Sequence, residues 1–305
     1  MYPFYERQEH FDIFMDRVEI PTDARAYLHK VQDVINSVPE RRCAFETLVV
    51  EFMREPQTQI VNALGKMDQM AAELHYSAYT FHFLLLLNAS YFLRKQYDRA
   101  GIAEEIFWDT MHDLKYKLAE CVANHNVFGT FVGWWYKKIF SVGIFALGRL
   151  QYEHNIYPMR ETYKRAGIRV DWGDPVLSIH IPSCGPLTEP LRMDSYRRAF
   201  NFFSRDRQPI VCICDSWLLY KGHEEFLPEQ SNIRSFMRDF DIIESRDHEK
   251  PRGGWQVFGP AALNDPATWP EDTGLQKAYK NRVLTGRSTG NGFGILIFDG
   301  EKIIR

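Results

Sequence analysis

The segment from residue 175 to residue 220 constrains the fold more than any other part of the chain. Val176–Ile181 is a short, mostly apolar run rich in β-branched residues, which predicts a buried strand, and Ile210–Cys214 is a second run of this kind. Between them, apolar residues recur at intervals of three and four, which is the spacing of a helix that packs on one face. We therefore expect a strand, a loop, a helix and a second strand. The helix face consists of Tyr196, Ala199, Phe200 and Phe203.

The loop and helix start inside this segment predict a site for an anion. Ser183–Pro186 interrupts the strand, and Thr188 is a suitable N-cap residue for a helix that carries Glu189 and Pro190 in its first turn. This places a helix N-terminus at the carboxyl end of a strand. Its unpaired N–H groups and partial positive charge suit a phosphate or a carboxylate.

Length and composition narrow the class of protein. A chain of 305 residues can bury two full cores. The net charge of −3 argues against a nucleic-acid-binding protein with a general basic surface. Five cysteines without paired metal spacing predict reduced thiols in a cytoplasmic protein.

No segment has the pattern of a signal peptide or a membrane span. The first ten residues lack a basic region followed by an apolar one, and Phe83–Phe92 is too short to cross a bilayer. Val127–Gly148 is long enough, but Lys137 and Lys138 lie at its centre and would cost a few kcal/mol each on insertion. We expect a soluble protein that does not interact with membranes.

The spacing of hydrophobic residues changes along the chain and predicts two domains. Residues 1–140 have helical spacing and predict a helical N-terminal domain, and residues 141–305 predict a mixed α/β sheet domain, so the expected class is α+β. The expected helices are Asp23–Val38, Arg41–Met53, Gln57–Ala71, Glu73–Ala100 and Glu104–Ala123. Besides the two strands above, the expected strands are Leu147–Tyr152, Phe240–Ser245, Trp255–Phe258 and Phe293–Phe298, with short helices capped by Ser231 and Thr273.

Several sequence stretches resemble a group of bacterial acyltransferase-domain proteins. They are His180–Pro182, Gly185–Leu187, Ala199–Phe203, Cys214–Leu219 and Ser231–Phe236. Members of this group have a helical N-terminal domain and a GNAT-like C-terminal domain, and the resemblance covers residues 140–305 well and the helical part by pattern. It implies that two adjacent parallel strands separate and admit the pantetheine arm of a CoA thioester.

The resemblance also implies where acyl-CoA or acetyl-CoA would bind. The expected contacts are Ile181, Ser183, Cys184, Gly185 and Thr188, in the position of the phosphate cradle of the fold. The usual cradle is Arg/Gln-x-x-Gly-x-Gly/Ala, whereas this loop has one glycine, no arginine and a proline. A plain helix N-cap is the alternative interpretation. A literal match at residues 287–292 precedes a strand, so a hairpin or a bulged strand entry is expected there.

Three polar residues at the ends of the two central strands are the catalytic candidates. His180 or Asp215 can act as a base for an amine, and Ser216 or Tyr220 can protonate the leaving sulfur. The alternative is that Asp215 and Ser216 cap the turn after the strand. Cys184 at the helix start is a further nucleophile candidate, whereas Cys212 and Cys214 are expected to fill the core.

No metal site is expected. Asp109 with His112, and Cys121 with His125, are isolated pairs on helix faces, and His75 with His82 is another. Helical metal centres use several carboxylates from more than one helix. The sequence thus predicts an acyltransferase that passes an acyl group from a CoA or carrier-protein thioester to a small-molecule or peptide amine, without a metal. A non-catalytic binding or interaction protein that retained the fold is the alternative.

Overall fold

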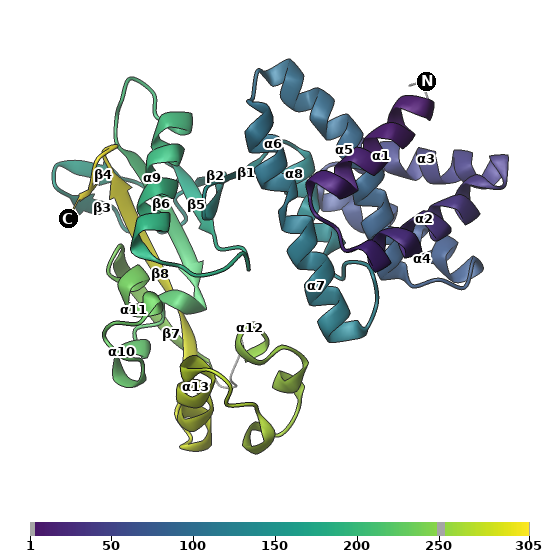
Figure 1. Ribbon diagram of the computed structural model, residues 1–305. Helices are drawn as coiled ribbons and strands as arrows, with labels where there is room; N and C mark the ends of the chain where they lie inside the picture. Colours follow the sequence, from purple (N-terminus) through teal and green to yellow (C-terminus); the bar gives the residue numbers. More distant parts are fainter. Residues whose placement is uncertain (1–3, 249–253, 305) are drawn as a thin grey trace. The chain divides into compact units, whose positions relative to one another are not determined.

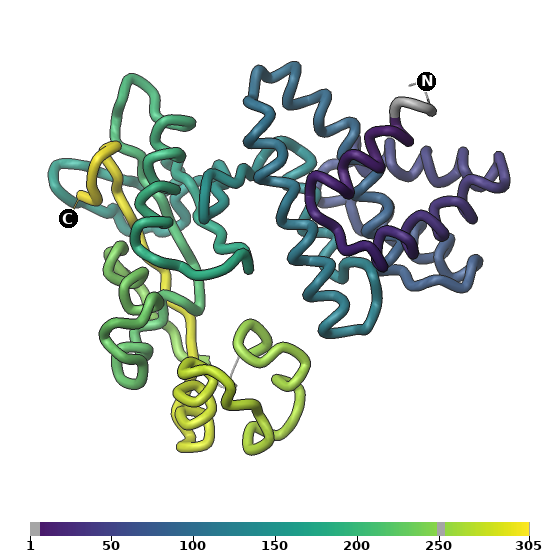
Figure 2. The backbone as a smooth tube through the Cα atoms, in the orientation of Figure 1, coloured from purple at the N-terminus to yellow at the C-terminus, as the bar shows by residue number. Residues whose placement is uncertain are grey.

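The structure (Figure 1) is a computed structural model that describes residues 4–248 and 254–304. It divides into two compact units, Met1–Phe145 and Ala146–Arg305. Figure 2 traces the first unit from purple to blue-teal and the second from teal to yellow. Each unit is described separately below.

The first unit is built from helices that pack around the long apolar helix α5, Ala78–Ala100. Its residues Phe83–Leu87 are buried in an unbroken run, so this part of the helix is apolar on all sides. Gly101 ends it in the left-handed conformation, as the sequence predicts. The other helices are α1 Phe4–Arg17, α2 Thr22–Asn36, α3 Pro39–Arg54, α4 Ile60–Glu73, α6 Glu104–Met111, α7 Asp113–His125 and α8 Tyr136–Phe140, with 3₁₀ turns η1 Gln57–Gln59 and η2 Gly133–Trp135.

Two predicted helix boundaries in this unit were wrong. The helix expected from Glu73 begins at Ala78, because His75 adopts a left-handed conformation (φ 57°) and separates α4 from α5. The helix expected over Glu104–Ala123 is two helices that meet at His112. The other three predicted helices are confirmed, apart from small shifts of their ends.

The second unit contains a mixed sheet with the strand order β1-β2-β5-β6-β8-β7, and β9 pairs with β8. The central strands β5 and β6 are parallel, and β5 pairs antiparallel with β2, whereas β6 pairs antiparallel with β8. The strands are β1 Ile144–Leu147, β2 Leu150–Ile156, β5 Pro175–His180, β6 Ile210–Ser216, β7 Asp241–His248, β8 Thr289–Phe298 and β9 Ile303–Ile304; β3 Tyr163–Arg165 and β4 Ile168–Val170 form a separate hairpin.

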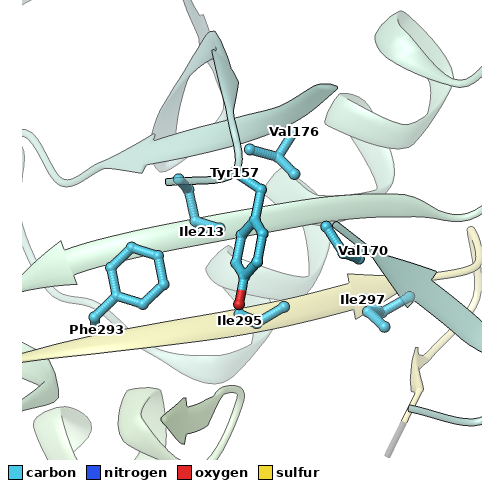
Figure 3. Close-up of a cluster of buried hydrophobic side chains, with 7 residues drawn as sticks. All are labelled: Tyr157, Val170, Val176, Ile213, Phe293, Ile295 and Ile297. Atoms are coloured by element: carbon cyan, nitrogen blue, oxygen red, sulfur yellow. The ribbon is translucent and has the colours of Figure 1, made fainter. Parts of the chain in front are cut away.

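The two faces of this sheet have different covers. Helix α9, Glu189–Phe203, packs on one face, where Tyr196 and Phe200 contact Phe298. The opposite face carries a hydrophobic cluster to which β4, β5, β6 and β8 all contribute (Figure 3). This cluster consists of Tyr157, Val170, Val176, Ile213, Phe293, Ile295 and Ile297.

Two strand predictions in this unit were wrong. Leu147–Tyr152 is not one strand, because Gly148 (φ 75°) turns the chain between β1 and β2. Trp255–Phe258 is not a strand but part of helix α12, Gly254–Phe258, and Phe258 packs there against Trp269 and Tyr279. The sequence also predicts a polar turn with proline and glycine over residues 247–254, most of which lies outside the described residues.

The remaining strand predictions and two predicted helix caps of this unit are confirmed, but the hairpin or bulged strand entry expected at residues 287–292 was wrong. Ser231 caps α11, Asn232–Met237, and Thr273 forms a full capping box at α13, Gly274–Leu284. The glycine-rich run before Phe293 is itself the start of β8, without a separate hairpin. At Gly292 a Cβ atom would lie 2.0 Å from the Leu219 carbonyl oxygen, so a glycine lets the 3₁₀ turn η3, Trp217–Leu219, pack directly on the strand.

Short helical turns complete the second unit. They are α10 His223–Phe226, η4 Gly259–Leu263 and η5 Pro266–Thr268. Among the described residues of both units, no helix combines the length and the apolar character needed to cross a bilayer.

Candidate active site

The two parallel strands at the centre of the sheet separate before they end. β5 and β6 pair at Leu177–Cys212 and Ser178–Ile213, which are the last pairs between them in the described structure. β5 nevertheless continues beside β2 as far as His180, and β6 continues beside β8 as far as Ser216. Each strand thus remains in the sheet through its other neighbour. Past Ser178 the facing edges carry backbone groups that a ligand can use.

Helix α9 begins at the carboxyl end of β5, as the sequence predicts. Thr188 occupies the N-cap position with extended backbone, but its side chain makes no capping hydrogen bond in the described structure. Pro190 lies in the first turn, where its missing N–H costs nothing. The start of α9 therefore keeps the partial positive charge of its N–H groups.

A buried arginine holds the β5–α9 loop, residues 181–188. Arg149, in the turn between β1 and β2, donates to the carbonyl oxygens of Pro182 (2.9 Å), Gly185 (2.8 Å) and Pro186 (3.1 Å). Gly185 has a φ of 108°, which strongly favours glycine. Because C=O and N–H point in opposite directions across a trans peptide, the N–H groups of Ser183 and Leu187 point away from Arg149. The loop thus lies in front of a guanidinium supplied from another element.

A second buried arginine anchors the end of the same loop. Arg192 on α9 is fully buried and donates to the Leu187 carbonyl oxygen (2.7 Å) and to Asp239 Oδ2 (2.6 Å). The hydroxyl groups of Ser235 and Tyr196 complete this network, and the carboxylate of Asp239 together with burial holds the pKa of Tyr196 well above its ordinary value. The network fixes α9 against the residues that follow α11.

His180 forms a pair with a carboxylate that the sequence did not reveal. His180 Nε2 lies 2.8 Å from Oε2 of Glu153, which belongs to β2. Both side chains lie on the same sheet face, since His180 pairs with Gln151 and Glu153 pairs with Ser178 in the β2–β5 register. An ionised carboxylate only accepts hydrogen bonds, so it favours the tautomer with hydrogen on Nε2 and the lone pair on Nδ1. This arrangement suits a general base.

The other two predicted catalytic residues, Asp215 and Ser216, have hydrogen-bond partners outside this pair. Ser178 pairs with Ile213, and residues two positions apart on a strand lie on the same face, so Asp215 shares the sheet face of His180. The carboxylate of Asp215 is half exposed and binds Arg246 (2.6 Å). Ser216 lies on the opposite face, and its hydroxyl accepts from the Leu218 N–H (3.2 Å) to cap η3. The structure thus has the capping arrangement at Ser216 that was the alternative to catalysis.

Tyr220 and the cysteines occupy other surroundings. The Tyr220 hydroxyl donates to Asp247 Oδ1 (2.6 Å). Cys212 and Cys214 are fully buried, and burial raises the pKa of both thiols far above the ordinary value, so they remain neutral core residues. Cys184 is half-buried in the β5–α9 loop, with its Sγ atom 3.9 Å from the Arg149 carbonyl oxygen.

No cluster that could hold a metal ion is found among the described residues. Several histidines of the three pairs noted in the sequence contact other side chains instead. His82, for example, binds Asp68 (2.8 Å), and His125 stacks on Tyr79.

The separated parallel strands, the helix start beside them and the helical first unit define a class of two-domain GNAT-like proteins. Residues 144–296 match the family described as "GNAT-like C-terminal domain", and residues 9–142 match the family described as "N-acyltransferase N-terminal domain". The chain belongs to the family with this GNAT-like C-terminal domain. A comparison with curated proteins found no match.

Solved structures of acyltransferases share the fold over nearly the whole chain. An acyltransferase in complex with decanoyl-CoA and teicoplanin superposes with a TM-score of 0.72 at 23% identity, over 95% of this chain and 88% of that chain. A mutant acyltransferase in complex with octanoyl-CoA gives a TM-score of 0.70 at 22% identity, over 94% and 87%. These matches establish the α+β arrangement of a helical N-terminal part and a GNAT-like C-terminal part.

Proposed function

We propose that this protein transfers an acyl group from a CoA thioester to an amine. The matches to the GNAT-like C-terminal domain and the N-acyltransferase N-terminal domain support the reaction class, and the loss of pairing between β5 and β6 beyond Ser178 is the observation that carries the binding mode. The pantetheine arm would lie along the two free strand edges, as an extra strand with its own amide groups. The structures with decanoyl-CoA and octanoyl-CoA support a medium-length acyl chain as the donor.

The β5–α9 loop would hold the phosphates of the donor. Its candidate contacts are the backbone groups of Ile181, Ser183, Cys184, Gly185 and Thr188. The loop itself lacks the arginine of the usual cradle, and Arg149 behind it supplies a guanidinium instead. The charge of Arg149 and the α9 N-terminus both favour an anion at this loop.

His180 would act as the general base of the transfer. The amine nitrogen attacks the thioester carbonyl carbon, its proton passes to His180 directly or through a water, and the C–S bond breaks with departure of the CoA thiolate. Glu153 stabilises the imidazolium that forms. Asp215, on the same face, is a candidate for binding the amine as its ammonium ion. Ser216 keeps a capping role in this scheme.

The acceptor would be a small molecule or a peptide with a free amine. One acyltransferase of similar fold is described in complex with teicoplanin, which supports a small-molecule or peptide acceptor. The proposal includes a cytoplasmic setting, because all five cysteines are free thiols, and the bacterial origin that the sequence resemblance implies.

Incubation with acyl-CoA thioesters of two to twelve carbons and a panel of amines tests this function. We expect thermal stabilisation by medium-chain donors and release of CoA thiol that depends on the amine. A stabilisation of about 2.7 kcal/mol is expected when the donor concentration is about 100 times its dissociation constant. Stabilisation without thiol release for any amine would favour the non-catalytic binding protein. The absence of both stabilisation and thiol release would contradict the proposal.

A further inference from the structure

A groove on the helical unit combines an apolar floor with a cationic rim. It has a volume of about 420 Å³ and lies between α1, α3 and α5, entirely within residues 1–145. Sites for small molecules have volumes of roughly 300–1,000 Å³. The groove is lined by Arg7, Glu46, Val50, Met53, Arg54, Phe92, Lys95, Gln96 and Arg99.

Helical spacing brings these residues to one place. On α5, residues 92, 95, 96 and 99 follow the i, i+3, i+4, i+7 pattern of a single helix face, and on α3 residues 46, 50, 53 and 54 follow a similar one. The two helices pack against each other. The partly buried side chains of Val50, Met53 and Phe92 form the floor, and the exposed side chains of Arg54, Lys95 and Arg99 stand at the rim.

The charge of the groove is not balanced by its own residues. Four cationic side chains line it against one carboxylate, Glu46, and that carboxylate already binds Arg7 at 2.7 Å. The Nε atom of Arg7 is buried without a hydrogen-bond partner in the described structure. Arg54 and Arg99 lie in the last turns of α3 and α5, where the helix dipoles offset part of their charge, but Lys95 lies further inside α5.

A hollow on the second unit shows what a balanced site looks like. It has a volume of about 680 Å³ beside Tyr220 and is lined by three cations and three carboxylates. Arg282 and Arg287 there both bind Glu225, at 2.9 Å and 3.4 Å. Two of its three cations are therefore already paired with a carboxylate of the same hollow.

We propose that the groove on the helical unit binds a single-chain anionic amphiphile, of the class of a medium-chain fatty carboxylate. The alkyl chain lies on Val50, Met53 and Phe92, and the anionic head lies among Arg54, Lys95 and Arg99. Burial of the chain supplies affinity and the charge-assisted hydrogen bonds select the head group. This groove is formed by the helical unit alone, whereas the proposed donor site is formed by the second unit, and the proposal does not depend on acyl transfer.

Calorimetric titration of the full-length protein tests this site with four probes: hexanoate, octanoate, decanoate and the cation decyltrimethylammonium. We expect saturable binding of decanoate, with an affinity that rises roughly fourfold for each added methylene group. The cation has the same chain length and is expected not to bind. Equal binding of decanoate and decyltrimethylammonium, or no saturable binding of any carboxylate, would overturn the proposal.

Variants assign the binding to this groove. Lys95→Gln with Arg99→Gln removes two rim charges, and Met53→Gln keeps the side-chain length while making the floor polar. Each variant is expected to weaken decanoate binding roughly tenfold. Lys30→Glu, at an exposed position on α2 outside the groove, is the matched control and should bind like the wild type. Unchanged binding in both groove variants, with unchanged melting temperature, would place the ligand elsewhere and overturn the assignment.

An experiment with lipid vesicles distinguishes binding of a free amphiphile from binding to a membrane surface. Flotation with phosphatidylglycerol vesicles, compared with phosphatidylcholine vesicles, reports binding to an anionic bilayer. Decanoate binding that depends on the groove, with no flotation, supports the proposal. Flotation without binding of monomeric decanoate would overturn it, because the cations would then serve a lipid surface. Thiol release from acyl-CoA is expected to be the same in the groove variants and in the wild type, so a failure here is distinguishable from a failure of the proposed acyl transfer.

Discussion

The imidazole of His180 and the carboxylate of Glu153 meet across two neighbouring antiparallel strands, with 2.8 Å between Nε2 and Oε2. The Glu153 side chain is 11% exposed and that of His180 is 25% exposed, so the pair is shielded on the carboxylate side and accessible on the imidazole side. A base oriented by a mostly buried carboxylate suits the proton transfer from an amine that the proposed function includes.

Substitution at this pair is expected to reduce the rate of transfer more than the binding of the donor. His180→Ala removes the base and should lower kcat by roughly 10²–10⁴-fold. Glu153→Gln keeps the shape but loses the charge, and should lower kcat by roughly 10–10²-fold. Thiol release at saturating donor measures both effects. Glu161→Gln, at an exposed position in the same unit, is the control, and equal rates in His180→Ala and the wild type would exclude His180 as the base.

Arg149 is expected to matter for stability as well as for donor binding. Arg149→Met removes the three hydrogen bonds to loop carbonyl oxygens and should lower the free energy of unfolding by about 2 kcal/mol or more. Arg198→Met breaks an exposed ion pair on α9 with Asp194 and should cost less than about 1 kcal/mol. Denaturant unfolding measures the difference, and equal losses in the two variants would show that Arg149 does not hold the loop.

Breaking the buried network of Arg192 and Asp239 is expected to lower the stability more than the loss of Arg149. Asp239→Ala would leave the fully buried Arg192 guanidinium without its carboxylate, which should destabilise the protein by about 3–5 kcal/mol. Asp194→Ala, which removes an exposed carboxylate from the same helix, should be nearly neutral. The melting temperatures of the two variants test this expectation. A mild effect of Asp239→Ala would mean that the network is not needed to dock α9.

Buried His223 and partly buried His10 predict a loss of stability in mild acid. Burial, with repulsion from Arg94 and Lys95, lowers the pKa of His10 to about 4, and burial lowers the pKa of His223 to about 4, with Arg282 contributing. The unfolded chain binds these protons near pH 6.5, so between pH 6.5 and 4 the unfolded state carries more protons than the folded one. Stability therefore falls as the pH drops through this window, by up to about 3 kcal/mol for each histidine.

The contribution of His223 can be isolated by substitution. Its ring is packed among Trp217, Tyr220 and Phe226, so His223→Phe should be accommodated. The free energy of unfolding of this variant is expected to decline less than that of the wild type between pH 6.5 and pH 4. Identical pH dependence in the two proteins would show that His223 is protonated equally in the folded and unfolded states.

The sequence predicted the parts of the site that follow each other along the chain. The strand ending at His180, the helix beginning after Thr188 and the strand beginning at Ile210 are local patterns of hydrophobic period and capping, and each is confirmed. Contacts between side chains of the site that come from different strands could not be predicted from such local patterns. Glu153 and Arg149 reach the site only because β2 pairs with β5, and strand register is a property of the whole sheet.

The wrong predictions have the same origin. Trp255–Phe258 has the composition of a strand, yet Phe258 packs against Trp269 and Tyr279 from distant segments, and this tertiary contact favours a helix. Leu147–Tyr152 alternates as a strand does, but Gly148 in the left-handed region turns it into a hairpin connection. A glycine inside an alternating run was the available signal for that turn.

In the proposed function, a CoA thioester binds between β5 and β6 and donates its acyl group to an amine. The most direct measurement is the amine-dependent release of CoA thiol from decanoyl-CoA by the wild type and by His180→Ala, with donor binding recorded in parallel by thermal shift. We expect the donor to stabilise both proteins and only the wild type to release thiol at a substantial rate. A wild-type protein that neither gains stability nor releases thiol with any acyl-CoA would contradict it.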